Sequence, residues 1–432
     1  MRKVLIITYY WPPSGGAGVQ RWLKFVKYIR DFGWEPVIYT PSNPEFPVLD
    51  ETLSCEIPSG IEVINKPIWE PYQFYKKITG KKSSEKINNG FLNDKKSPGL
   101  FERLAIWIRG NLFIPDARKY WIKPSILFLV RYIQNNPVDA IISTGPPHSM
   151  HLIALGIKER LNIPWLADFR DPWTDIDFYK DMKISHFADK KHKTLELRTI
   201  KGCNVMVVVS REMKENYEKM GANNVVLITN GFDTADLDNH PITADKKFSI
   251  AHIGSLQPNR NPKILWRVLE ELLITIPGFR NDLEIKLVGK VDISVFEDLE
   301  RHKLNENLNK IDYVSHNKVT ELMKQSAVLL LAINDSSNSK GILTGKFFEY
   351  LAAGRPILAI GPLDGDVAQI LKDSEAGVIA DYHDTEQMKK IIIQLYEKYL
   401  RNDLSVLPKG IEKYSRRNLT GELTEILNKI VL

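Results

Sequence analysis

Short runs of β-branched and apolar residues alternate with helix-period patterns along almost the whole chain. In the first half, the predicted strands are residues 3–8, 36–40, 61–64, 138–143, 164–168, 204–209 and 225–229. Helices are predicted between them, at 18–32, 119–135, 147–161, 186–200 and 211–220. Strands that alternate with helices form parallel sheets, because a parallel connection needs a crossover long enough to hold a helix. The first half is therefore expected to be a doubly wound α/β domain.

The second half repeats this alternation and predicts a second domain of the same class. Its strands are expected near 248–253, 283–288, 310–313, 327–332 and 356–360, and its helices near 262–276, 316–325, 344–353, 364–372 and 384–400. The polar stretch 233–247 indicates a linker, so the domains are expected at 1–235 and 246–410. Ligands of such sheets bind beyond the carboxyl ends of the strands. A site is therefore expected in the loops that follow strands, in a cleft between the domains.

Composition excludes several classes of protein. A hydrophobic content of 43% and a charged content of 26% are typical of globular domains. Cys55 and Cys203 lie outside any CxxC spacing, so neither a disulfide framework nor a zinc site is expected, and a reducing cytoplasm fits best. The apolar run after Lys3 is too short for a signal peptide, and no uncharged apolar run approaches the roughly 18 residues of a membrane span.

Basic residues gather in one part of the first half. The net charge is +6, and the segment 76–98, expected to be a mobile insertion, holds a cluster of lysines: Lys76, Lys77, Lys81, Lys82, Lys86, Lys95 and Lys96. An aromatic and basic stretch follows at 101–133. A solvated loop explains the lysines and packing in the core explains the aromatic stretch, but together the two segments also allow shallow docking on an anionic membrane.

The loop after the first strand, TYYWPPSGGAGVQRW at residues 8–22, is rich in glycine. Glycines such as Gly15 and Gly16 let backbone N–H groups approach a ligand, and the N-terminus of the next helix favours negative charge. The dinucleotide fingerprint is absent, because Arg21 stands where its third glycine belongs, and no Walker lysine follows. The loop is either a tight turn or an anion-binding loop.

A second loop, in HIGSLQPNRNPKILW at 252–266, places Ser255 and Arg260 after a strand. Asn261 followed by Pro262 is typical of a helix start with asparagine as the N-cap. Arg260 would then lie beside unpaired helix N–H groups, a combination that suits a phosphate. A surface carboxylate as the partner of Arg260 is the alternative.

The helix predicted in GILTGKFFEYLAAGRPILAIG, 341–361, carries the sharpest signal. Thr344 is its expected N-cap, so Lys346 lies in the first turn, where a cation opposes the helix dipole unless an anion binds there. Glu349 lies one turn later on the same face and can accept both hydroxyls of a ribose. The alternative is a surface ion pair between Lys346 and Glu349.

These segments, together with VVVSREMKENY and ITNGFD, resemble the retaining glycosyltransferases of family 4, in order and over nearly the whole chain. The resemblance implies the GT-B fold, in which two Rossmann-like α/β domains face a cleft. It implies that Glu349 holds the ribose of a nucleotide-sugar donor and that Arg260 and Lys346 meet its diphosphate. The loop at Gly15 and Gly16 would close over the donor's phosphate or sugar.

Two departures from the family pattern affect the expected donor-sugar contacts. Gly341 stands where relatives commonly carry a second glutamate, and Arg170-Asp171 stands where many carry a histidine. Backbone N–H groups near Gly341 and side chains of DFRDPW are the local substitutes, unless DFRDPW only braces the cleft by ion pairing. The candidate catalytic residues are Arg260, Lys346, Arg170 and Asp171, with Asp168 in support. The candidate donor-binding residues are Glu349, Gly15, Gly16, Ser255, Gly341, Ile342, Leu343 and Thr344.

No metal or other cofactor is expected. The stretches 175–177 and 364–366 each match the DxD pair of another glycosyltransferase fold, but a pattern so short arises by chance. His148 and His151 lie one helix turn apart without an evident third ligand, so a capping or cleft role fits them better than metal binding.

The sequence is interpreted as a retaining enzyme that moves a hexosyl or N-acetylhexosaminyl group from a nucleotide sugar to a saccharide or polyprenyl-linked acceptor, in cell-envelope glycan synthesis. The resemblance implies a front-face reaction, in which the leaving diphosphate helps to deprotonate the acceptor hydroxyl, and a last helix, 411–432, that packs on the N-terminal domain. The expected place is the cytoplasm, with peripheral membrane contact and no nucleic-acid partner. Two alternatives stay open: a catalytically silent scaffold subunit and a nucleotide-sugar epimerase.

Overall fold

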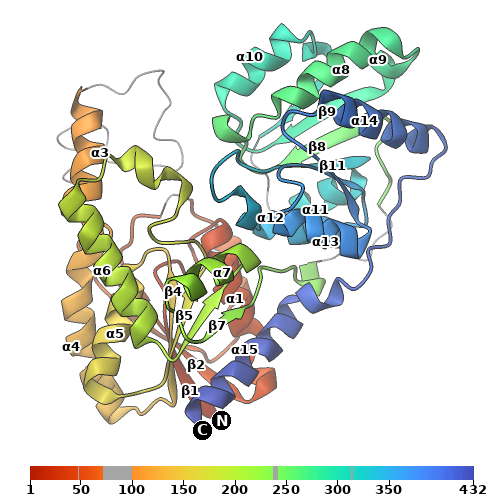
Figure 1. Ribbon diagram of the computed structural model, residues 1–432. Helices are drawn as coiled ribbons and strands as arrows, with labels where there is room; N and C mark the ends of the chain where they lie inside the picture. The colour runs from red at the N-terminus through yellow and green to blue at the C-terminus, as the bar shows by residue number, and fades with distance from the viewer. Residues whose placement is uncertain (47, 72–99, 237–241, 313, 315) are drawn as a thin grey trace. The chain divides into compact units, whose positions relative to one another are not determined.

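The computed structural model describes residues 1–46, 48–71, 100–236, 242–312, 314 and 316–432 (Figure 1). The chain divides into two compact units. Unit 1 consists of Met1–Thr229 and Arg416–Leu432, and unit 2 consists of Asn230–Ser415. The division falls directly after Thr229, a few residues before the stretch that sequence indicates as a linker.

Unit 1 is built on a parallel sheet of seven strands in the order β3-β2-β1-β4-β5-β6-β7. The strands are β1 (Arg2–Ile7), β2 (Trp34–Pro41), β3 (Glu62–Lys66), β4 (Ala140–Gly145), β5 (Trp165–Phe169), β6 (Val205–Val208) and β7 (Val225–Leu227). The α-helices are α1 (Ala17–Ile29), α3 (Leu100–Leu112), α4 (Lys119–Asn135), α5 (Ser149–Leu161), α6 (His186–Gly202), α7 (Arg211–Lys219) and α15 (Arg416–Val431). Every strand predicted in this half is confirmed, whereas α3 was not predicted. The lysine-rich insertion lies outside the described residues.

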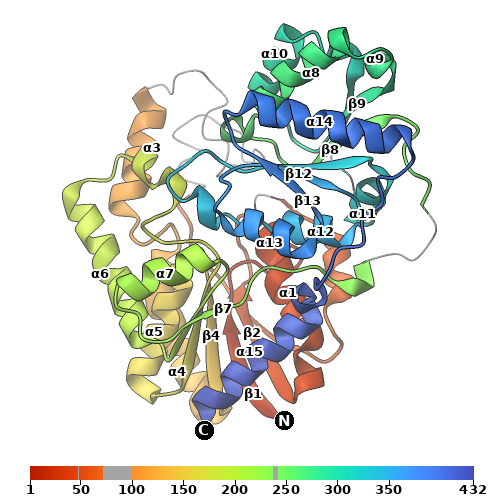
Figure 2. The same ribbon diagram turned by 45° about the vertical axis from the view of Figure 1, so that its right-hand side comes forward.

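Alternate residues of a strand face opposite layers of unit 1, as the two-residue period requires. Val4 and Ile6 of β1 pack in the core with α1 and α15, whereas Leu5 and Ile7 pack in the core with α4 and α5. Figures 1 and 2 show these helices on the two faces of the sheet. The chain's last helix, α15, therefore packs on the N-terminal unit, as the resemblance implied.

Unit 2 is built on a parallel sheet of six strands in the order β10-β9-β8-β11-β12-β13. The strands are β8 (Phe248–Ile253), β9 (Leu283–Val288), β10 (Leu308–Ile311), β11 (Val328–Ala332), β12 (Ile357–Ile360) and β13 (Gly377–Ala380). The α-helices are α8 (Lys263–Thr275), α9 (Phe279–Asp282), α10 (Ile293–Arg301), α11 (His316–Gln325), α12 (Gly345–Ala352), α13 (Asp366–Ser374) and α14 (Thr385–Leu400). The sequence predicted all of these except β13, α9 and α10, which are short.

Both sheets change direction beside their first strand, between β1 and β4 in unit 1 and between β8 and β11 in unit 2. The loops that leave these neighbouring strands diverge to opposite faces, and this is where doubly wound sheets bind ligands. The carboxyl ends of β1 and β4, and of β8 and β11, are therefore the positions at which to look for chemistry. In the described part of the chain, no helix has the length and apolar character of a membrane span.

Candidate functional site

Polar side chains gather in unit 2 where β8 and β11 end. Gly254 directly follows β8 and has a φ of 112°, which glycine adopts without strain. A Cβ on Gly254 would lie only 2.6 Å from Nζ of Lys346. The missing side chain thus leaves room for Lys346, which comes from the first turn of α12, to lie across the end of β8.

His252 fixes the position of the Lys346 ammonium. The His252 side chain is buried in β8; its Nδ1 lies 3.1 Å from the Leu330 carbonyl oxygen, and its Nε2 lies 3.3 Å from Lys346 Nζ. Nε2 also lies 3.4 Å from the Ser255 carbonyl oxygen. We place the ring proton on Nδ1, because Nδ1 then donates over the shorter distance to Leu330 and Nε2 accepts from Lys346, whereas a proton on Nε2 would leave Nδ1 and the Leu330 oxygen as two facing acceptors. Burial and the neighbouring Lys346 hold the pKa of His252 well below its usual value, which keeps the ring neutral.

The positive charge of Lys346 is not balanced by a carboxylate. Burial, followed by the like charge of Arg260, lowers the pKa of Lys346 from 10.5 to about 7, while Glu349 acts in the opposite direction. Lys346 forms no ion pair with any residue that the structure describes. The alternative hypothesis for this helix, a surface ion pair between Lys346 and Glu349, is therefore not what the structure shows.

Arg260 lies in the turn Pro258–Arg260 after β8, and a neutral amide holds it. Its Nε donates a hydrogen bond to Oδ1 of Asn334, the second residue after β11. Asn334 is itself buried, and its carbonyl oxygen accepts from the Tyr382 hydroxyl at 2.7 Å. The strand ends at the switch point of unit 2 thus bring together two cationic side chains from separate segments.

The predicted start of the helix after Arg260 is wrong by one position. α8 begins at Lys263, and Pro262 occupies the N-cap position, without a side-chain cap bond. The Asn261 side chain instead donates to Asp298 at 2.7 Å and accepts from the Trp266 indole at 2.8 Å. Asn261 fails as a cap because its amide joins α8 to α10.

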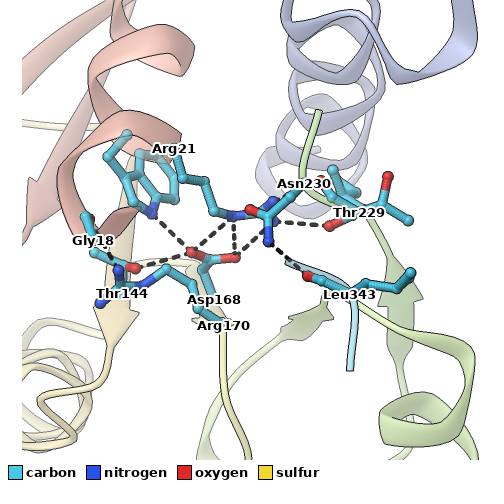
Figure 3. A network of polar contacts seen from close by, with 10 residues as sticks. Gly18, Arg21, Thr144, Asp168, Arg170, Thr229, Asn230 and Leu343 are labelled. Carbon is cyan, nitrogen blue, oxygen red and sulfur yellow. Dashed lines mark hydrogen bonds and ion pairs between the residues drawn. The ribbon is translucent and has the colours of Figure 1, made fainter. Parts of the chain in front are cut away.

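The N-terminus of α12 is partly available to a ligand. Thr344 occupies the N-cap position as predicted, but its Oγ1 makes no cap bond and is buried without a partner in the described residues. The N–H groups of Gly341 and Ile342 already donate to carbonyls of their own turn, at 3.2 and 3.3 Å, which removes two donors expected to meet the donor sugar. The Asn230 amide anchors this segment by donating to the Leu343 carbonyl at 3.3 Å (Figure 3).

Glu349 lines a small pocket of unit 2 one turn after Lys346. Within the described residues its carboxylate has no hydrogen-bond partner. The other lining residues are Phe232, Asp233, Asp236, Thr320, Met323 and Ala353. Carboxylates accept but do not donate, so the pocket suits a ligand that offers hydroxyl donors. Ser255, the remaining candidate of this unit, lies exposed directly after Gly254.

In unit 1, a buried ion pair occupies the strand ends (Figure 3). Asp168 of β5 accepts from Nη2 of Arg21 at 2.9 Å, from the Trp22 indole at 2.7 Å and from the Thr144 hydroxyl at 2.9 Å. Arg21 also donates to the Thr229 carbonyl at 2.7 Å, where the chain leaves unit 1. Burial alone would raise the pKa of Asp168, but Arg21 holds it below its usual value. From the sequence, Arg21 was identified only as the residue at the place of the third glycine of the dinucleotide fingerprint, and its pairing with Asp168 was not predicted.

Arg170 also braces unit 1. Its Nη1 donates to the Gly18 carbonyl at 2.9 Å and its Nη2 donates to the Pro146 carbonyl, so that it ties the start of α1 to the loop after β4. Asp171 is exposed. Of the two interpretations of DFRDPW, bracing therefore describes Asp168 and Arg170, and the exposed Asp171 places a negative charge that favours the charged form of Arg170.

The glycine loop and the two histidines have separate roles in unit 1. Gly15 is buried and donates to the Val48 carbonyl at 2.9 Å, whereas Gly16 is exposed, precedes α1 and has a φ of 88°.

His148 stacks on Trp173 and His151 stacks on Phe169, and both rings are buried. Burial lowers the pKa of His151 to about 3, so this ring is a neutral packing group. No cluster of three potential metal ligands occurs among the described residues.

Two family models match the chain, one in each half. Residues 92–236 match Glycosyltransferase Family 4, and residues 247–398 match Glycosyl transferases group 1. A stretch of 162 residues is 27% identical to the D-inositol 3-phosphate glycosyltransferase of Acidothermus cellulolyticus. That match covers 36% of this chain and 35% of the relative, so it spans about a third of the relative's length.

Solved structures share the fold along nearly the whole chain. The sucrose-phosphate synthase of Thermosynechococcus elongatus superimposes with a TM-score of 0.63 at 12% identity, over 99% of both chains. A TarM variant of S. aureus, solved with fondaparinux, alpha-GlcNAc-glycerol and UDP, superimposes with a TM-score of 0.59 at 12% identity, over 99% of this chain and 100% of that one. The two family models and this shared architecture of two parallel sheets establish that the chain belongs to the family 4, group 1 glycosyltransferases of the GT-B fold.

Proposed function

We propose that the protein transfers a sugar from a nucleotide-sugar donor to a saccharide or lipid-linked saccharide, with retention of the anomeric configuration. The Lys346 ammonium carries this proposal: it is held over Gly254 at the end of β8, near Arg260, and pairs with no described carboxylate. A helix N-terminus and two cations form a site for an anion, and the donor's diphosphate supplies the missing negative charge.

In this proposal the protein acts on the leaving group. Lys346 and Arg260 stabilise the negative charge that grows on the diphosphate as the glycosidic bond breaks, which is where preorganised charge lowers a barrier most. The leaving phosphate takes the proton of the acceptor hydroxyl on the same face of the sugar. Glu349 accepts hydrogen bonds from the ribose hydroxyls and so places the nucleotide.

The relatives support a class of donor and acceptor. The TarM variant was solved with UDP and alpha-GlcNAc-glycerol, and the curated relative is named a D-inositol 3-phosphate glycosyltransferase. We infer a hexosyl or N-acetylhexosaminyl donor and a role in cell-envelope glycan synthesis in the cytoplasm.

An aromatic and basic patch on unit 1 supports contact with an anionic membrane. Tyr120, 51% exposed, lies with its ring centroid 5.1 Å from that of Trp69, which is 59% exposed. Lys119 Nζ lies 4.8 Å from the centre of the Tyr120 ring and 5.2 Å from that of Phe113. Aromatic rings beside a lysine are typical of surfaces that dock at the headgroup level.

Vesicles of phosphatidylcholine with and without phosphatidylglycerol test this patch by co-sedimentation. We expect binding to the anionic vesicles at low salt, release as ionic strength rises, and weaker binding of a Trp69→Ser, Tyr120→Ser variant. Binding that depends on neither lipid charge nor salt would remove the membrane from the proposal.

Thermal unfolding in the presence of a panel of nucleotide sugars tests the donor site. A ligand at about 100 times its Kd adds roughly 2.7 kcal/mol to the free energy of unfolding. Donor hydrolysis, or transfer to a saccharide, then shows that the bound sugar reacts. A folded chain that neither binds nor turns over any donor would be the silent scaffold, and a donor epimerised without an acceptor would identify an epimerase.

A further inference from the structure

His252 has a contact pattern that packing alone does not require. The ring is 1% exposed inside β8, an otherwise apolar strand apart from Ser249, and its Nδ1 is committed to the Leu330 carbonyl of β11. This bond fixes the rotation of the ring, and with it the position of Nε2, which the Ser255 carbonyl oxygen also approaches, at 3.4 Å. Lys346 Nζ lies 3.3 Å from Nε2.

Burial and the charged groups around Lys346 determine the pKa of its ammonium. Arg260, from the turn after β8, opposes the ammonium form, and Glu349, one turn later on α12, favours it. His252 faces the amine from β8 as a neutral ring. Because burial adds to the effect of Arg260, the pKa of Lys346 falls to about 7, and a substantial share of the free protein carries a neutral amine above that pH.

We propose that His252 is a positioning residue for Lys346, and that the pair couples binding of a nucleoside diphosphate to the uptake of a proton by the Lys346 amine. The inference rests on the proposed function, since it takes the diphosphate to bind at Lys346. The proton comes from solvent and is bound at Nζ, and no covalent bond changes.

The sign of the coupling follows from the charges. A diphosphate beside Nζ favours the ammonium, so it raises the pKa of Lys346. Below about pH 7, Lys346 is largely protonated with and without ligand, and little proton is taken up. Above that pH the free protein loses the proton and the complex keeps it, so affinity falls by up to about tenfold per pH unit until the pKa of the complex is reached.

Two substitutions of His252 separate positioning from packing. Asn at this position presents an amide N–H near the place of Nδ1–H, so His252→Asn retains the bond to Leu330 but removes the acceptor for Lys346. Gln reaches the place of Nε2 with an amide oxygen, so His252→Gln restores the acceptor. Without an acceptor the ammonium is less favoured, so His252→Asn should begin to lose affinity at a lower pH than the wild type.

The experiment is calorimetric titration with uridine, adenosine and guanosine diphosphate at about pH 6.5, 7.5 and 8.5, in two buffers of different ionisation enthalpy. For the diphosphate that binds, we expect proton uptake that rises toward one per site at the highest pH. Lys346→Arg, which stays charged throughout this range, should bind with little pH dependence and no uptake. His252→Gln should follow the wild type, and His252→Asn should show the lower onset with an unchanged melting temperature.

The outcomes distinguish this inference from the proposed function. Binding of one diphosphate with affinity and proton uptake that do not change from pH 6.5 to 8.5 would overturn the coupling and leave the donor site standing. An onset in His252→Asn equal to that of the wild type would overturn the positioning role. Failure of all three diphosphates to bind at pH 6.5 would overturn the donor site and this inference together.

Discussion

The carboxyl ends of the two sheets use charge in opposite ways. In unit 1, Nη2 of Arg21 lies 2.9 Å from Oδ1 of Asp168, and both side chains are buried. Each side chain also forms hydrogen bonds with other protein groups. In unit 2, Lys346 and Glu349 lie one turn apart on α12 but form no pair in the described structure. Charges that satisfy each other stabilise a fold, whereas charges held apart at a strand end are available to a ligand.

The largest expected effect breaks the closed network of unit 1. Asp168→Asn keeps the shape of the side chain but leaves the buried Arg21 guanidinium with a neutral partner. Losing one member of a buried ion pair costs about 3–5 kcal/mol. For a unit of this size that lowers the melting temperature by roughly 6–20 °C. Calorimetric melting of the purified variant measures it, with Glu349→Gln as the control that should melt like the wild type.

The pH dependence of this effect has a definite sign. Because Arg21 depresses the pKa of Asp168, the carboxylate stabilises the fold above the ordinary aspartate pKa of about 4, and this contribution is lost as pH falls through the depressed value. The difference in stability between wild type and Asp168→Asn should therefore be constant from pH 6 to 8 and shrink below about pH 4. A variant as stable as the wild type at pH 7 would contradict the contrast between the units.

The open charges of unit 2 predict a catalytic defect with little loss of stability. Lys346→Met keeps the aliphatic chain over Gly254 but removes the ammonium. A hydrogen bond to a charged group contributes about 1.5–3 kcal/mol, so kcat/KM should fall by roughly tenfold to a hundredfold. Since charge grows on the diphosphate during reaction, kcat should fall as well as affinity. Steady-state kinetics against donor concentration measures both, with the exposed Lys409→Met as control, and wild-type kinetics in Lys346→Met would remove the donor site.

Glu349 should show a smaller and different defect. A ribose keeps its hydroxyls unchanged from ground state to transition state, so a residue that binds it contributes equally to both. Glu349→Gln should therefore raise the KM for the donor by about tenfold while kcat stays near that of the wild type. The same donor titration reports it. A fall in kcat with KM unchanged would place Glu349 at the reacting centre instead.

The sequence predicts the fold well because the fold depends on local periodicity. Seven strands of unit 1 and five of unit 2 lie where apolar runs predicted them, since each run must be buried between helical layers. β13 was missed because Gly377–Ala380 is a four-residue edge strand with too little pattern to distinguish it from a loop. The last helix was placed on unit 1 only through the resemblance, because no local signal reports a contact across almost 400 residues.

The site is predicted less completely, because its geometry depends on distant partners. Lys346 and Glu349 follow from the helix pattern, but Asn334 and His252 approach Arg260 and Lys346 only through the order of the strands. A lone histidine in the apolar run FSIAHI was the available signal for His252. The cap predicted at Asn261 failed for a related reason, since Asp298 and Trp266 take up its amide.

The smallest expected effect is that of removing divalent metals, which asks whether side chains alone neutralise the diphosphate. Lys346, Arg260 and the N-terminus of α12 supply positive charge there, while Asp364 of one DxD stretch lies 2.6 Å from Lys340 and is engaged by it. Transfer should therefore continue at the wild-type rate in excess EDTA. Lys346→Met sharpens the test: a metal that shared the diphosphate should partly restore this variant when Mg²⁺ or Mn²⁺ is added, whereas we expect no restoration. Complete loss of wild-type activity in EDTA, restored by either ion, would mean that a metal ion, and not Lys346, neutralises the diphosphate. Glu349 would then be the only open charge left for the contrast between the units.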